Sequence, residues 1–215
     1  MALTFYYLSG SPYAWRVWLA LEHKGISYQL RTMSYDAGDF QNPEFAALNP
    51  RRRVPVIDDE GFALYESAAI LEYLEDKWQD RSRLFSSDLH QRATQRRMVR
   101  EADQYFATRL EDLVEAVLFT SPDRRSQEKV DAAWDSMRAE LAMWEGLISG
   151  DWLAGELSAA DFSLFPEIAL GQRIAQRNPG LTRGELLGSR LQAWTARMQS
   201  LPVVQRTWPP HWRPS

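Results

Sequence analysis

The chain has 215 residues, of which 45% are hydrophobic, 25% are charged and 12% are aromatic. This is the composition of an ordinary globular protein, and the length suits either one large domain or two small ones. The formal net charge of -4 gives no electrostatic reason to bind a polyanion, so we expect neither nucleic acid nor membrane as a partner.

The absence of cysteine excludes disulfides, thiolate metal sites and a nucleophilic sulfur of the protein's own. The three histidines, His23, His90 and His211, are far apart in the sequence and lack metal-ligand spacing, so we expect no metal. The first residues have no basic leader and are typical of a strand, and no apolar run reaches membrane-spanning length. We therefore predict a cytoplasmic protein that acts on small molecules.

The first third of the chain alternates between strand and helix patterns. Residues 3–8 are rich in β-formers and end in the turn Ser9-Gly10-Ser11-Pro12, which can also begin a helix. That helix is predicted to end near Gly25, and residues 26–31 are typical of a second strand. This stretch therefore predicts a β-α-β unit.

A second unit of different order follows. Two short strand patterns at residues 54–58 and 62–65 are separated by Asp59-Glu60-Gly61, a spacing typical of an antiparallel hairpin. Apolar residues at helical spacing then predict a helix over 66–78. The order β-α-β and then β-β-α is that of a thioredoxin-like domain.

Beyond about residue 87 the patterns predict helices alone. Long helical patterns cover 89–119 and 122–148, and the polar stretch 79–88 between the halves has no periodicity. We predict a first domain of residues 1–78, a linker of 79–88 and an all-helical domain of 89–215. The tail is predicted to be extended and to pack on a surface through Trp208 and Trp212.

Two features adjoin the predicted hairpin. Pro55 cannot donate to a sheet ladder, so it must stand at a strand start, at an edge or in a cis turn. A cis Val54-Pro55 bond would turn the Val54 amide and carbonyl outward, where an extended peptide could pair with them. An ordinary edge-strand proline explains the residue equally well.

Glu66 and Ser67 stand where a strand gives way to a helix. The first amides of a helix lack intrahelical partners and the helix dipole favours an anion, so this point is a natural carboxylate site. Capping of the helix by Ser67 is the alternative, and taken alone it is the commoner explanation.

Together these motifs resemble those of the cytosolic glutathione transferases, with zeta-like and theta-like classes nearest. The resemblance rests on the segments Ser11 to Val17, Asn49 to Ile57 and Tyr65 to Ile70, is strong up to residue 78 and is weaker beyond. It implies a thioredoxin-like domain followed by an α-helical bundle domain. It also implies glutathione as co-substrate without a metal, and a homodimer.

The resemblance implies a role for each motif. The cysteinyl part of glutathione would bind at Val54 and Pro55, and the γ-glutamyl carboxylate at Glu66 and Ser67. Arg53 would reach the glycyl carboxylate, although a run of arginines is usually a solvated charge run.

Ser11 is the residue that we expect to activate the thiol. In serine-type families a serine at the end of the first strand donates a hydrogen bond that favours the thiolate, and Ser11 aligns with it through Trp15-Arg16-Val17. A helix cap before Pro12 is the alternative role for Ser11. Ser9 is a rival two residues away, and the less favoured candidates are Tyr6, Tyr7 and Tyr13.

We therefore predict a glutathione transferase that conjugates glutathione to a hydrophobic electrophilic small molecule, as in detoxification. Zeta-like isomerases carry Ser-Ser-Cys before Trp-Arg-Val, and omega-like and beta-like members use a cysteine, which this chain lacks. The alternatives are a glutathione-dependent isomerase, lyase or dehalogenase on the same site, or a non-catalytic glutathione-binding domain.

Overall fold

The computed structural model describes residues 3–148, 150–181 and 185–213. The chain divides into two compact units, Met1–Phe85 with Leu201–Ser215, and Ser86–Ser200. The predicted linker 79–88 contains the point of division. The segment from Leu201 belongs to the first unit, whereas the sequence analysis placed it in the helical domain.

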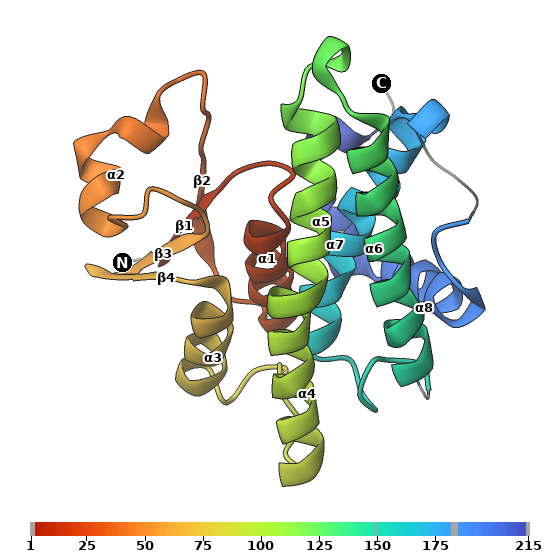
Figure 1. Cartoon of the computed structure of the whole chain (residues 1–215). Helices are drawn as coiled ribbons and strands as arrows, with labels where there is room; N and C mark the ends of the chain where they lie inside the picture. Colours follow the sequence, from red (N-terminus) through yellow and green to blue (C-terminus); the bar gives the residue numbers. More distant parts are fainter. Residues whose placement is uncertain (1–2, 149, 182–184, 214–215) are drawn as a thin grey trace. The chain divides into compact units, whose positions relative to one another are not determined.

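The first unit is built on a four-stranded sheet with the strand order β2-β1-β3-β4. Strand β1 is parallel to β2 and antiparallel to β3, and β3 is antiparallel to β4 (Figure 1). The four strands are β1 Leu3–Tyr7, β2 Tyr28–Thr32, β3 Val56–Asp59 and β4 Phe62–Tyr65. The predicted thioredoxin-like order of elements is therefore confirmed.

Helices α1 (Pro12–Lys24) and α3 (Ser67–Lys77) cover one face of this sheet, and α2 (Pro43–Leu48) covers the other (Figure 1). Because side chains alternate along a strand, neighbouring residues of β1 serve different faces. The Tyr7 ring packs against Trp18 of α1 with a centroid distance of 4.7 Å, and the Tyr6 ring packs against Phe45 of α2 at 5.6 Å.

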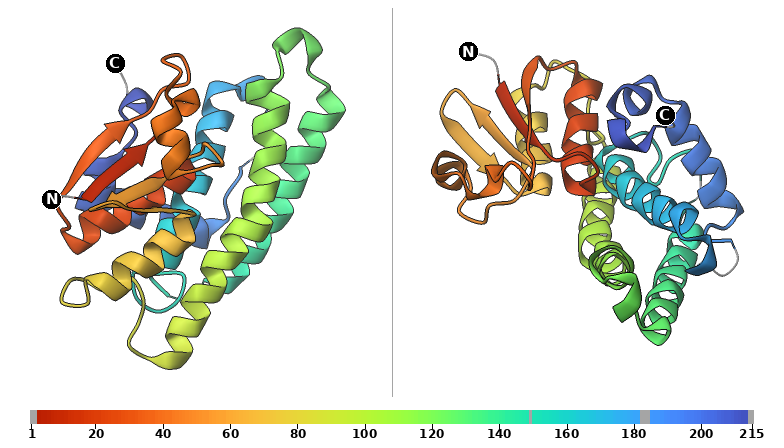
Figure 2. Two further views of the ribbon diagram at one scale, coloured as in Figure 1. Left: turned by 90° about the vertical axis from the view of Figure 1, so that its left-hand side faces the viewer. Right: turned by 90° about the horizontal axis from the view of Figure 1, so that it is seen from above.

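The end of the chain also packs on α1. Helix α9 (Pro202–Thr207) and a short helical turn, Pro210–Trp212, lie beside α1 (Figure 2). Trp15 of α1 meets Trp208 and Trp212 edge to face, with centroid distances of 5.2 and 5.6 Å. The predicted packing of the tail through these two tryptophans is confirmed.

In the described residues of the second unit, all regular structure is helical. Its longest helices run side by side (Figure 2), and the described helices are α4 Leu89–Glu101, α5 Ala107–Val114, α6 Gln127–Leu147, α7 Ala159–Arg177 and α8 Ser189–Ser200. Wider π-helical turns at Ala102–Phe106 and Glu115–Phe119 continue α4 and α5, so the helical pattern predicted over 89–119 is present. Among the described residues, no helix combines the length and apolarity that a membrane crossing requires.

Candidate functional site

Three chain segments meet at one edge of the sheet. In the strand register Tyr6 lies opposite Val56, and Val56 lies opposite Tyr65. The end of β1, the beginning of β3 and the end of β4 are therefore neighbours, because β3 runs antiparallel to both other strands.

These segments carry the candidate residues. Ser11 follows β1, the dipeptide Val54-Pro55 precedes β3, and Glu66 and Ser67 follow β4. Residues that are up to 56 positions apart in the sequence are thus gathered at this edge by strand pairing alone. Arg53, one residue further from β3, is exposed at the margin of the same segment.

Ser11 is the N-cap residue of α1, with Pro12 in the first helical position. Its hydroxyl oxygen accepts a hydrogen bond from the Ala14 amide at 3.3 Å, so the capping role is confirmed. A hydroxyl that accepts can still donate its own proton. No residue that the structure describes accepts that proton, so capping and a bond to a ligand are compatible.

The tyrosine rings near this edge pack against other side chains of the first unit. Burial raises the pKa of Tyr7 more than its interactions with the Ser9 hydroxyl and the Gly10 backbone lower it. Burial also raises the pKa of Tyr6, which faces α2. Tyr13 lies one residue inside α1, where its ring stacks with the Arg16 guanidinium 5.2 Å from the ring centroid.

Ser9, the rival of Ser11, is already engaged. Its Oγ lies 2.7 Å from Nδ1 of His211, and either atom can donate depending on the tautomer. The hydroxyl of Ser9 is therefore directed to the C-terminal segment, which leaves Ser11 as the better placed of the two serines.

The Val54-Pro55 peptide bond is cis, and Val54 is half-buried. The ladder of β3 begins at Val56, and within the described residues the Val54 amide and carbonyl make no hydrogen bond. The preceding loop is held by the buried side chain of Asn49, which donates to the Arg53 carbonyl at 2.8 Å and accepts from the Arg51 amide at 2.9 Å. Sequence reasoning missed this role of Asn49.

The beginning of α3 shows whether Ser67 caps this helix. Ser67 is the first residue of the helix, while Glu66 occupies the cap position and makes no side-chain capping bond. The explanation that Ser67 caps the helix is therefore wrong. The largely buried Ser67 has no hydroxyl partner among the described residues, so this hydroxyl and the first amides of α3 are available together.

The three arginines before Val54 differ in their contacts. Arg52 donates to the Gln41 side chain at 2.6 Å and has a positive φ of 52°. The exposed Arg53 guanidinium has no partner in the described part of the chain. A cation is thus available near the free backbone of Val54.

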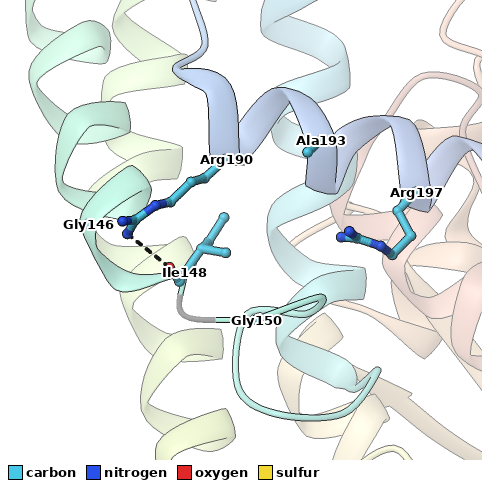
Figure 3. A pocket seen from close by; sticks show the side chains of 6 residues that line it. All are labelled: Gly146, Ile148, Gly150, Arg190, Ala193 and Arg197. Carbon is cyan, nitrogen blue, oxygen red and sulfur yellow. Dashed lines mark hydrogen bonds between the residues drawn. The ribbon is translucent and has the colours of Figure 1, made fainter.

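A pocket of about 490 Å³ lies in the helical unit, between the end of α6 and one side of α8 (Figure 3). Arg190 donates to the Ile148 carbonyl at 3.3 Å, and Arg197 pairs with the Asp151 carboxylate at 2.9 Å. Because both guanidinium groups have partners within the chain, this pocket offers less to an anion than the sheet edge does.

A family model described as the N-terminal domain of glutathione S-transferase matches residues 10–77, which include Ser11, Arg53, Val54-Pro55 and Glu66-Ser67. The chain is also 35% identical over 159 residues to glutathione S-transferase 4 of Zea mays, covering 72% of this chain and 71% of that protein. The chain belongs to the glutathione S-transferase family.

Two further relatives are similar to this chain over different lengths. A maleylacetoacetate isomerase of Pseudomonas aeruginosa is 43% identical over 99 residues, which is 45% of each protein. The crystal structure of a Pseudomonas putida glutathione transferase with glutathione disulfide bound is 25% identical, with a TM-score of 0.83. The match covers 96% of this chain and 90% of that one, so the expected family and fold are confirmed.

Proposed function

We propose that this chain binds glutathione at the sheet edge and conjugates it through its sulfur to an electrophilic small molecule. The observation that carries the proposal is the convergence of three sets of available polar groups on one edge. These are the Ser11 hydroxyl, the Val54 amide and carbonyl, and the Ser67 hydroxyl with the first amides of α3. The Pseudomonas putida relative, with glutathione disulfide bound, supports this ligand class.

The chemistry of the tripeptide matches these groups. An extended peptide can add to Val54 as a short strand, because the Val54 backbone has one donor and one acceptor to offer. The γ-glutamyl carboxylate suits the α3 amides and Ser67, where the helix dipole favours an anion. We assign the glycyl carboxylate to Arg53.

Ser11 then acts on the cysteinyl thiol. A hydroxyl that donates to sulfur favours the thiolate, which lowers the thiol pKa from its reference of about 8.5. A hydrogen bond to a charged group contributes about 1.5 to 3 kcal/mol, which corresponds to about one to two pKa units. The thiol proton leaves to solvent, and the rate rises with the thiolate population and with the proximity of the electrophile.

A glutathione-dependent isomerase is the second candidate, because of the similarity to the maleylacetoacetate isomerase. In that chemistry the thiolate adds to its substrate and is expelled again, so free glutathione is regenerated. A transferase instead consumes one thiol for each product. A binding domain without turnover does neither.

The test combines turnover with binding. Electrophiles of several classes and a cis-configured unsaturated diacid are incubated with glutathione and protein, and both free thiol and substrate are followed. Loss of both supports the transferase, and loss of substrate at constant thiol supports the isomerase. No turnover with any substrate supports the binding domain.

Binding is measured by calorimetry on two serine variants. Ser67→Ala should weaken glutathione binding by about 1 to 2 kcal/mol, which is about 5- to 30-fold. Ser27→Ala is the matched control, because Ser27 precedes β2 at the opposite edge of the sheet. Equal affinity of the two variants would count against the assignment of Ser67.

We also propose a two-fold homodimer in the cytoplasm, as the family resemblance implies. Light scattering at micromolar concentration should then give twice the mass of one chain. A particle of single-chain mass would contradict the dimer.

A further inference from the structure

The C-terminal segment is held against the turn that carries Ser11. His211 Nδ1 lies 2.7 Å from Ser9 Oγ, and the imidazole lies beside Gly10. A Cβ added to Gly10 would come within 3.1 Å of His211 Cε1, and the φ of Gly10 is +88°. Only glycine adopts such a conformation readily, so this close approach depends on Gly10.

The residues on both sides of His211 are anchored on α1. Trp212 is buried and meets the fully buried Trp15 edge to face, and Trp208 meets Trp15 in the same manner. Thr207 accepts a hydrogen bond from the Trp15 indole at 2.9 Å. The exposed contact of His211 with Ser9 therefore adjoins a packed group of tryptophans on α1.

This arrangement bears on Ser11 because the two serines share one turn. The Ser11 amide donates to the Leu8 carbonyl at 3.1 Å, across Ser9 and Gly10. A glycine with positive φ gives such a turn conformational freedom. The hydrogen bond between Ser9 and His211 removes part of that freedom, because it restrains the Ser9 side chain. The direction of the Ser11 hydroxyl depends on the conformation of this turn.

We propose that His211 is a positioning residue of the glutathione site, acting through its hydrogen bond with Ser9 on the turn that orients Ser11. The inference rests on the proposed function. His211 touches the turn and is not assigned a contact with the tripeptide, so it affects the thiolate more than it affects the binding of glutathione. Ser9 and His211 act as one pair, and the loss of either member has the same effect as the loss of both.

The experiment uses the full chain in four forms besides the wild type: Ser9→Ala, His211→Ala, the double variant and His211→Asn. The apparent pKa of bound glutathione is read from thiolate absorbance, kcat and KM from steady-state kinetics, and Kd from calorimetry. His90→Ala is the control for loss of an exposed histidine, because His90 lies on α4 in the other unit.

We expect Ser9→Ala and His211→Ala each to lower kcat about 3- to 10-fold, the scale of one neutral hydrogen bond. Each should raise the apparent pKa of the bound thiol and change the Kd for glutathione by less than about twofold. The double variant should match the single ones, because the two residues form one interaction. His211→Asn, whose amide can replace Nδ1, should restore most of kcat.

If the wild type binds glutathione and turns over substrate, either of the following results would overturn the inference alone. One is a kcat of His211→Ala equal to that of the wild type, and the other is a pair of losses that multiply in the double variant. Equal loss in His90→Ala and His211→Ala would do the same. A wild-type protein that binds no glutathione would overturn the proposed function and this inference together, so the two failures are distinguishable.

Discussion

The Trp15 indole nitrogen donates a hydrogen bond to the Thr207 hydroxyl at 2.9 Å, and both side chains are completely buried. The two residues are 192 positions apart, so this bond fastens the C-terminal segment to α1. We expect Thr207→Val to lower the free energy of unfolding by about 1 to 3 kcal/mol, because it removes the hydrogen bond that a buried indole N–H donates to Thr207. Urea denaturation measures this loss. Thr94→Val, at an exposed position on α4, is the control and should change little.

The ionisation of Asp59 should make the free energy of unfolding depend on pH. Burial raises the pKa of the Asp59 carboxyl, but hydrogen bonds from Lys77 and Tyr73 outweigh that effect, so the pKa lies below its ordinary value of 3.8. The stabilisation is therefore complete above pH 3.8 and is lost as the pH falls through the lower folded-state pKa. Asp59→Asn should lower the free energy of unfolding at pH 7 by about 1 to 2 kcal/mol.

The test of Asp59 is a series of urea denaturations from pH 7 to pH 2. The difference between wild type and Asp59→Asn should shrink as the pH falls below 3.8. Asp80→Asn is the control, since the Asp80 side chain is 78% exposed. If the difference in free energy of unfolding between wild type and Asp59→Asn stayed constant across this range, the ion pair of Asp59 with Lys77 would not be its source.

Glu66 has φ 70° and ψ 105°, a backbone conformation that is strained for any residue with a Cβ. We expect Glu66→Gly to relieve strain of the order of 1 kcal/mol, which offsets the added chain entropy of glycine, so thermal stability should not fall. Glutathione affinity should fall, because the proposed γ-glutamyl site would lose the Glu66 side chain beside Ser67. Thermal denaturation and calorimetry measure the two effects.

Glu60→Gly provides the matched control for Glu66→Gly. Glu60 also has a positive φ, of 57°, but it lies in the hairpin between β3 and β4 at the opposite edge of the sheet. Replacing Glu60 with glycine should likewise not lower thermal stability, and it should leave glutathione affinity unchanged. Equal affinity losses in the two variants would show that Glu66 has no special role in binding.

Most of the first unit was predictable from the sequence, because strand and helix periodicities change at marked turns. Strand β4 was predicted with its observed bounds, 62–65. Strand β3 begins two residues later than predicted, at Val56, because Pro55 has no N–H for the ladder. The π-helical turns after α4 and α5 were not predicted, because a helical pattern in the sequence does not indicate where a turn widens.

The candidate site was predictable as motifs, and its spatial assembly follows from strand order. The sequence left capping by Ser67 as an alternative, and it could not exclude that alternative because a positive φ at Glu66 leaves no mark in the sequence. The contact between Ser9 and His211 joins residues 202 positions apart, and no local pattern indicates it. Tertiary contacts of that kind depend on how the C-terminal segment packs, which local periodicity does not determine.

The central claim is that Ser11 holds glutathione as the thiolate, and ultraviolet absorbance of the bound thiolate as a function of pH tests it most directly. In the wild type the apparent pKa should lie below the reference of about 8.5 for a free thiol. In Ser11→Ala it should rise by about one to two units while the Kd for glutathione stays nearly constant, and Ser27→Ala should follow the wild type. Coincident titration curves for the wild type and Ser11→Ala, at equal occupancy by glutathione, would contradict the claim.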